Sequence, residues 1–230
     1  MAILYHHPFC PHSRFIRLSI AEMGIEADLI EEKVWERREA FLALNPAGTT
    51  PVLVEEQIAS VPGSRIIAEW LDETRGLALN DRRLLPENPS ARVEVRRLVA
   101  WFTEKFGAEV SEPLVHEKIY KRFMPGDVGG GPPDPAVFRA AKSNIRYHLK
   151  YIGYLIRQRK WLAGEALSYA DLAAAAHLSC VDYLGDVPWD EDAVARDWYA
   201  RVKSRPSFRT LFEDRVLGMA PSPVYADLDF

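Results

Sequence analysis

The stretch AILYHHPFCPHSRFIRLSIAEMG, Ala2 to Gly24, predicts the first two elements of the fold. Its opening residues, 2–5, are apolar and suit a short strand. From Pro11 onward the apolar side chains recur at helical spacing, and Gly24 supplies a stop signal. Cys10 lies at the junction, directly before the proline that begins the predicted helix. We therefore expect a strand and a helix with a cysteine between them.

Outward from this stretch, the chain continues to alternate strand-like and helix-like patterns up to about residue 76. We expect a strand at 26–34, a short helix at 36–44, a hairpin at 50–60, and a helix at 64–75 that ends at Gly76. The order βαβ-α-ββα predicts a mixed sheet with helices packed on its faces.

The second half of the chain is predicted to be almost entirely helical. We expect helices over 91–123, 136–160, 168–184, 190–204 and 206–217. Ser168 and Asp171 form a capping-box pattern before an alanine-rich helix that should be buried on all sides. The intervening loop, 124–135, holds three consecutive glycines and a Pro-Pro pair, and we expect it to be mobile.

These patterns divide the chain into four parts. We predict an α/β domain over 1–77, a polar, proline-broken linker over 78–88, an all-α domain over 89–217, and a C-terminal tail over 218–230.

Composition narrows the class of protein. The 230 residues are 48% hydrophobic, which is enough for one large domain or two small ones. A net charge of −4 does not indicate binding to nucleic acid. The two cysteines, Cys10 and Cys180, are too few for a disulfide framework. Neither a signal peptide nor an apolar run of about 20 residues is evident, so we expect a cytoplasmic protein without a membrane span.

Three further stretches follow the first in a characteristic order: NPAGTTPVLVE (45–55), SRIIAEWLDE (64–73) and WLAGEALSYADLAAA (161–175). Together they resemble the glutathione transferase family, and the resemblance spans residues 3–217. It implies a thioredoxin-like N-terminal domain followed by a helical C-terminal domain, usually in a homodimer.

The resemblance places Cys10 where cysteine-type members of the family keep their nucleophile. A thiolate at the start of a helix is stabilised by the exposed N–H groups, and Pro11 suits the first turn. Ser13 takes the second redox position, so no internal disulfide can form there. The competing interpretation is that Cys10 is a buried, small apolar residue.

Thr50 and Pro51 resemble the family's cis-proline, which presents the backbone of the preceding residue to a peptide ligand. At Gly63-Ser64, glutathione-binding relatives have an acidic or amide residue followed by serine. Gly63 has no side chain to pair with the ligand's ammonium group, and losing a hydrogen bond to a charged group costs about 1.5–3 kcal/mol. Ser64 is explained equally well as the N-cap of the following helix.

We therefore expect a vestigial glutathione site, with no catalytic residue and no cofactor. Its residues are Cys10, Ser13, Thr50, Pro51, Gly63 and Ser64. His6, His7 and His12 cluster near Cys10 in sequence but lack a defined ligand set, so we expect no metal site.

The helix predicted at 136–160 contains no acidic residue. Basic side chains recur along one face at steps of three, four, four and seven: Arg139, Lys142, Arg146, Lys150 and Arg157. This stripe suggests an acidic partner, with the first four residues as its contacts. Two alternatives are a solvated face and ion pairs with Glu94, Glu104 or Glu109 of the preceding helix.

The chain ends in APSPVYADLDF, where Asp227 and Asp229 alternate with Leu228 and Phe230. Disordered tails carry few large apolar side chains. The last seven positions of this tail hold four, Val224, Tyr225, Leu228 and Phe230. They predict a short segment that docks on a partner through Asp227, Leu228, Asp229 and Phe230. The alternative is a tail that folds back over the cleft of its own domain.

The N-terminal run, the glycine-rich loop and the acidic end together resemble family members that act in bacterial cell division. This resemblance implies a non-catalytic protein at midcell that binds filaments of the tubulin-like protein FtsZ and bundles or curves them. The acidic tail would contact either a local basic pocket of the filament or another division protein. A dimer explains bundling, since two copies of one surface can join two filaments. The alternatives are a glutathione-dependent thiol transferase or reductase using Cys10, and an adaptor for another machine such as RNA polymerase.

Overall fold

The computed structural model describes residues 2–56 and 58–228. The first part of the chain forms a four-stranded sheet in the order β2-β1-β3-β4. Its strands are β1 (Ala2–His6), β2 (Ala27–Glu31), β3 (Val52–Glu55) and β4 (Ile58–Pro62). β1 pairs with β2 in parallel and with β3 antiparallel, and β3 pairs with β4 antiparallel. The predicted mixed sheet is confirmed.

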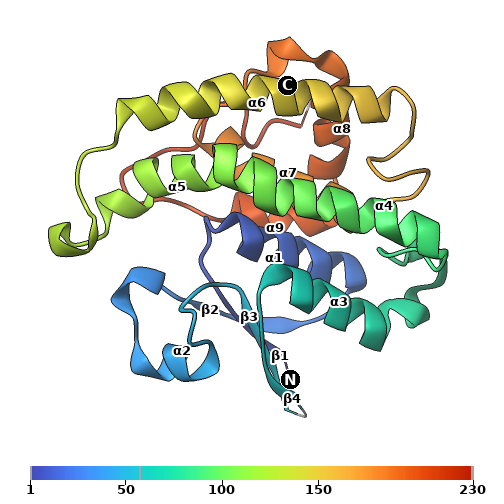
Figure 1. The fold of residues 1–230 in the computed structure, drawn as a ribbon, viewed down its shortest axis with the longest axis horizontal. Coiled ribbons are helices and arrows are strands. Elements are labelled where there is room, and N and C mark those ends of the chain that lie inside the picture. The colour runs from blue at the N-terminus through green and yellow to red at the C-terminus, as the bar shows by residue number, and fades with distance from the viewer. Residues whose placement is uncertain (1, 57, 229–230) are drawn as a thin grey trace.

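Three α-helices accompany this sheet: α1 (Pro11–Met23), α2 (Glu39–Leu44) and α3 (Ser64–Arg75). α1 begins with Pro11 in its first turn and ends at Gly24, whose φ of 69° lies in the left-handed region that favours glycine. α1 and α3 lie between the sheet and the second, helical part of the chain (Figure 1). α1 therefore buries side chains on two sides, which explains why Phe15, Ile16 and Leu18 are fully enclosed.

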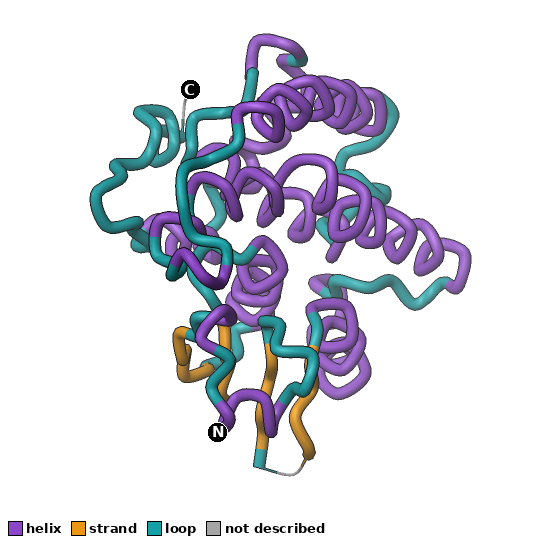
Figure 2. Tube along the Cα trace, turned by 60° about the vertical axis from the view of Figure 1, so that its left-hand side comes forward, coloured by secondary structure: helices purple, strands orange, loops and turns teal. Residues whose placement is uncertain are grey.

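The helical part begins with one long rod made of α4 (Pro89–Ala100), a π-helix (Trp101–Ser111) and α5 (Glu112–Lys118). It continues with α6 (Pro135–Ile156), α7 (Tyr169–Tyr183), α8 (Ala193–Lys203) and α9 (Arg209–Phe212). Short 3₁₀ turns occupy Val34–Glu36, Gly76–Arg82, Tyr120–Arg122, Gly126–Val128, Trp189–Glu191 and Pro206–Phe208. In Figure 2 the strands gather at one end and the helices stack above them. Within residues 2–56 and 58–228, no helix has the length and apolarity needed to cross a bilayer.

α7 is the centre of this helical part. All fifteen of its residues are buried, as the alanine-rich pattern predicted. Ser168 and Asp171 form the predicted capping box, in which the Asp171 carboxylate accepts the Ser168 N–H at 3.1 Å. The small side chains of 173–176 let α1 pack closely against α7. α1 thereby joins the sheet domain to the core of the helical domain.

Candidate functional site

A cleft of about 1260 Å³ lies between the two parts of the chain. The sheet domain contributes polar and small groups, including Cys10, Thr50, Gly63 and Ser64. The helical domain contributes a mostly apolar wall that includes Val99, Val115, Tyr120 and Val137. Four of the six predicted glutathione-site residues thus meet in one cleft, whereas Ser13 and Pro51 are not among its lining residues. The hydroxyl of Ser13 is buried and accepts the His7 N–H at 3.4 Å.

Cys10 is the N-cap of α1, and only 8% of its surface is exposed. Its Sγ donates toward the Thr50 carbonyl oxygen at 3.6 Å. The Thr50–Pro51 peptide bond is cis, as the family resemblance implied. The thiol therefore faces the backbone segment that the resemblance assigns to a peptide ligand.

Gly63 is the N-cap of α3, so the interpretation of Ser64 as the N-cap is wrong. The φ of Gly63 is 88°, a conformation that favours glycine, and its N–H donates to the Pro51 carbonyl oxygen at 2.9 Å. A glycine offers no side chain to cap the helix. The first N–H groups of α3 therefore have no side-chain cap among the described residues.

Ser64, His12 and Glu112 form a hydrogen-bonded chain across the cleft. Ser64 Oγ lies 3.1 Å from His12 Nδ1, and His12 Nε2 lies 2.9 Å from Glu112 Oε1. Glu112 comes from the rod, five residues after Gly107. A β-carbon at Gly107 would lie 2.7 Å from Glu112 Oε1, so the glycine leaves room for this carboxylate. Sequence reasoning missed Glu112 because no local signal links it to a histidine 100 residues away.

The remaining histidines near the cleft are structural. Burial lowers the pKa of both His6 and His7 to about 3, so both are neutral at physiological pH. Burial also lowers the pKa of His177 well below its usual value. His7 packs edge-on against Tyr120. Among residues 2–56 and 58–228, no group of three His, Cys, Asp or Glu side chains is placed to hold a metal ion.

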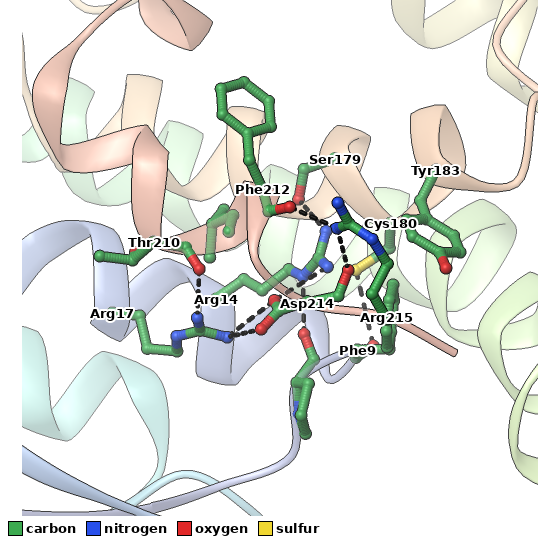
Figure 3. A network of polar contacts seen from close by, with 12 residues as sticks. Phe9, Arg14, Arg17, Ser179, Cys180, Tyr183, Thr210, Phe212, Asp214 and Arg215 are labelled. Carbon is green, nitrogen blue, oxygen red and sulfur yellow. Dashed lines mark hydrogen bonds and ion pairs between the residues drawn. The ribbon is translucent and has the colours of Figure 1, made fainter. Parts of the chain in front are cut away.

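A buried network of charges fastens the helix that carries Cys10 to the C-terminal region. Figure 3 shows Arg14 and Arg17 converging on Asp214, with N···O distances of 3.1 and 2.8 Å. Arg14 also donates to Ser179 Oγ at 2.9 Å, and Arg17 donates to the Thr210 carbonyl oxygen at 2.8 Å. Arg14 and Arg17 share the single carboxylate of Asp214, so each guanidinium needs a further acceptor. Burying a charge without hydrogen-bonding partners would cost free energy of folding.

The other cysteine lies beside this network and is inert. Cys180 Sγ donates to the Phe9 carbonyl oxygen at 3.5 Å, and burial raises the pKa of the thiol to about 12 (Figure 3). Cys180 is therefore a packing residue, and within the described chain Cys10 is the cysteine that reaches the cleft.

The basic stripe of α6 has partners that the sequence did not predict. Lys142 pairs with Asp186 at 3.8 Å and Arg146 with Glu191 at 2.8 Å. Arg157 pairs with Asp192 at 2.9 Å. The side chains of Arg139 and Lys150 have no ion-pair partner within the part of the chain that the structure describes.

The expected partners of the stripe, Glu94, Glu104 and Glu109, are engaged by other cations. Glu94 binds Arg97 and Arg159, Glu104 binds Arg65, and Glu109 binds Lys105 and His148. Side chains of the rod itself, of α3 and of the region around α6 therefore satisfy these three acidic residues. The predicted pairing with this helix is wrong, because the acidic partners come from residues 186–192 instead.

The tail is anchored through Tyr225. This side chain is buried between Tyr183 and Phe212, and its hydroxyl donates to the Leu211 carbonyl oxygen at 2.8 Å. Lys203 Nζ donates to the Val224 carbonyl oxygen at 2.6 Å. The segment therefore folds back onto its own domain, although over α7 and α9 rather than over the cleft.

The end of the tail lies beyond this anchor. Asp227 and Leu228 follow Tyr225 and are exposed. Asp229 and Phe230, the other two residues predicted to dock on a partner, lie outside the described residues.

Comparison with protein families supports the predicted fold. Residues 4–80 match the family model for the glutathione S-transferase N-terminal domain, and residues 112–206 match the model for the C-terminal domain. The chain is also 43% identical over 230 residues to FtsZ-localized protein A of Caulobacter vibrioides, covering 99% of this chain and 97% of that protein.

Solved structures of similar proteins have the same fold. The structure described as FzlA from C. crescentus has a TM-score of 0.90 and 42% identity, covering 100% of this chain and 99% of that one. A protein from Sinorhizobium meliloti 1021, described as a glutathione S-transferase, has a TM-score of 0.97 and 52% identity over the full length of both chains. The fold and the sequence matches together show that this chain belongs to the glutathione transferase family.

Proposed function

We propose that this chain is a division protein that binds FtsZ filaments at midcell and holds neighbouring filaments together without using glutathione. The observation that carries this proposal is the 43% identity, over nearly the whole of both chains, to a relative named FtsZ-localized protein A. The proposal has three physical parts: a cleft without glutathione chemistry, a surface for the filament, and a second copy of that surface.

The cleft supports the first part. At Gly63 the chain has no side chain to receive a ligand's ammonium group. The hydroxyl of Ser64 is already hydrogen-bonded to His12. A glutathione molecule would thus find one polar partner missing and another occupied, so the predicted site residues are best explained as vestigial.

The unpaired cations of α6 support the second part. FtsZ-type proteins are acidic, and Arg139 and Lys150, which have no ion-pair partner among residues 2–56 and 58–228, can meet an acidic surface. Lys142 and Arg146, which lie between them on the helix, are partly neutralised by Asp186 and Glu191. We therefore assign most of the filament contact to the two free residues.

Exposed apolar side chains support the third part. Ile66 on α3, Val93 on α4, and Tyr147 and Tyr154 on α6 are each more than half exposed. Arg96 of α4 bonds to Glu69 of α3, and Trp101 of the rod contacts Tyr147, so these helices form one continuous surface. Exposed apolar groups on one surface indicate a protein contact. We propose that a second copy covers them.

The tyrosine flank and most of the basic stripe lie on different sides of α6. Tyr147 lies on the flank that faces Trp101, whereas Lys142 and Arg146 lie on the flank that faces residues 186–191. A dimer formed through the tyrosine flank would leave Arg139, Lys142 and Arg146 of each copy open, whereas Lys150, one turn from both Tyr147 and Tyr154, would lie at the edge of the interface. Each particle would then carry two filament sites, which is what bundling requires.

Co-sedimentation with FtsZ polymer tests the proposal. The wild-type chain should pellet with the polymer, and added salt should release it, because exposed charges are screened beyond about 8–10 Å. Arg139→Glu and Lys150→Glu should each weaken binding by about threefold to tenfold, or roughly 0.7–1.4 kcal/mol.

The matched control is Arg209→Glu on α9, an exposed arginine away from α6. It makes the same charge change and should leave binding unaltered. A wild-type chain that stays in the supernatant would refute the proposed function. Normal binding by both α6 variants would show that the filament surface lies elsewhere.

A glutathione-dependent thiol transferase remains the second candidate. The observation in its favour is the 52% identity to the S. meliloti protein described as a glutathione S-transferase, together with the position of Cys10 in the cleft. Glutathione binding separates the two candidates.

A further inference from the structure

The chain Ser64–His12–Glu112 has the arrangement of a nucleophile, a base and a residue that orients the base. Ser64 Oγ and His12 Nδ1 are 3.1 Å apart, and His12 Nε2 and Glu112 Oε1 are 2.9 Å apart. Both distances lie within the range for proton transfer between such groups. All three side chains line the cleft, so a bound molecule could reach them.

The hydrogen bonds fix the tautomer of His12. A carboxylate oxygen can only accept, so His12 Nε2 must carry the proton that it shares with Glu112. The lone pair of Nδ1 is then free to accept the proton of the Ser64 hydroxyl. The buried ring of His177 packs edge-on against His12 at 5.0 Å, which restricts the orientation of the imidazole. The geometry thus prepares His12 to act as a base toward Ser64.

The backbone around Ser64 supplies the second requirement, which is stabilisation of an oxyanion. The chain turns sharply from β4 through Gly63 into α3, and Ser64 is the first residue of this twelve-residue helix. A serine at a sharp strand-to-helix turn can use the N–H of the next residue to stabilise negative charge. Here that N–H belongs to Arg65, in the first turn of a helix without a side-chain cap.

We propose that Ser64 is the nucleophile of an ester-hydrolysing site, with His12 as general base and acid and Glu112 as the residue that positions His12. The lining of the cleft beyond Ser64 includes Val99, Val115 and Val137, so the site should favour esters with an apolar acyl group. This activity goes beyond the proposed division role, uses no glutathione and does not involve the Cys10 thiol.

The reaction needs only the ester and water. His12 Nδ1 takes the hydroxyl proton of Ser64 as Oγ bonds to the ester carbonyl carbon, and the carbonyl electron pair moves onto its oxygen. When this intermediate collapses, the bond to the alcohol oxygen breaks and His12 returns the proton to the leaving alcohol. Water then attacks the acyl-serine with His12 again taking the proton, and the carboxylic acid leaves as Ser64 recovers its hydrogen.

Two measurements test the inference. The first is hydrolysis of p-nitrophenyl butyrate by the full chain. Ser64→Ala should reduce the rate to that of buffer, and His12→Ala should lower it about 100-fold. Glu112→Gln should lower kcat while leaving KM unchanged, because Glu112 acts through His12. Ser143→Ala, which removes an exposed serine of α6, should have no effect.

The second measurement needs no variant and therefore does not depend on a mutant's folding. A fluorophosphonate probe should add once to the wild-type chain, and peptide mass mapping should place the adduct on Ser64. The inference is overturned if the wild-type chain neither hydrolyses the ester nor takes up the probe, or if hydrolysis survives in Ser64→Ala. An adduct on any other residue, Cys10 included, also overturns it. None of these results depends on FtsZ binding.

Discussion

At Gly63 the missing side chain acts against glutathione, and the positive φ makes any replacement of the glycine costly. An acidic side chain at this position would supply the missing partner for the ligand's ammonium group. No atom lies within 4 Å of the place where a β-carbon would stand, so the space exists. Gly63→Glu should therefore improve glutathione affinity tenfold to a hundredfold, or about 1.5–3 kcal/mol, as measured by titration calorimetry. It should also destabilise the fold by about 1 kcal/mol, because φ is 88°.

Gly63→Ala is the control for this residue. It introduces the same backbone strain without a carboxylate, so it should cost stability and leave glutathione affinity unchanged. The wild-type chain should show no saturable heat with millimolar glutathione. A wild-type dissociation constant in the low micromolar range would refute the vestigial site and favour a working transferase.

At the scale of elements, the C-terminal tail packs on its own domain as far as Tyr225, and we call this packed part the strap. Beyond Tyr225 the tail is exposed. Tyr225→Ala should lower the free energy of unfolding by about 3–5 kcal/mol, because it empties an aromatic site between Tyr183 and Phe212. Tyr225→Phe should cost about 1–3 kcal/mol, because the Leu211 carbonyl loses its donor. Urea denaturation measures both.

Leu228→Ala is the matched control for the strap. This side chain is 41% exposed, so its truncation should change the free energy of unfolding by less than about 0.5 kcal/mol. If Tyr225→Ala and the wild type had the same free energy of unfolding, the strap would not be packed on the helical domain. If the exposed end docks on a division protein, Leu228→Ala should impair division while the fold stays intact.

At the scale of the whole molecule, the exposed apolar groups on α3, α4 and α6 predict a homodimer. Light scattering at micromolar concentration should give twice the 26.1 kDa mass of one chain. Tyr147→Glu should yield monomers, because it places a charge within the apolar surface. Those monomers should still bind FtsZ polymer but should no longer bundle it. A wild-type mass of one chain would contradict this prediction.

Local patterns were sufficient to predict most elements and part of the cleft. The N-terminal strand, the helix that begins at Pro11, the capping box at Ser168 and the burial of α7 all depend on signals within a few residues. The divisions at 77, 88 and 217 stay predictions. The π-helix was missed, because i→i+5 bonding leaves no distinct apolar period over eleven residues.

The contacts that could not be predicted join residues distant in sequence. Glu112 reaches His12 across 100 residues. The alternative that paired the basic stripe with Glu94, Glu104 or Glu109 was wrong, because the pairing depends on which cations the fold places beside each carboxylate. Glu94, for example, is held by Arg97 and Arg159. A single sequence shows the charges but not this competition.

The Arg14–Asp214 contact has a consequence for how the protein is made. Arg14 lies in α1, yet its carboxylate partner is synthesised 200 residues later. Until Asp214 emerges, the cation would have to be buried unpaired or left in water. The N-terminal domain therefore cannot complete its packing during translation, as many N-terminal domains do. The nascent chain must keep this surface of α1 open until Asp214 arrives, so Arg14 makes the final packing of the first domain wait for the region around Asp214.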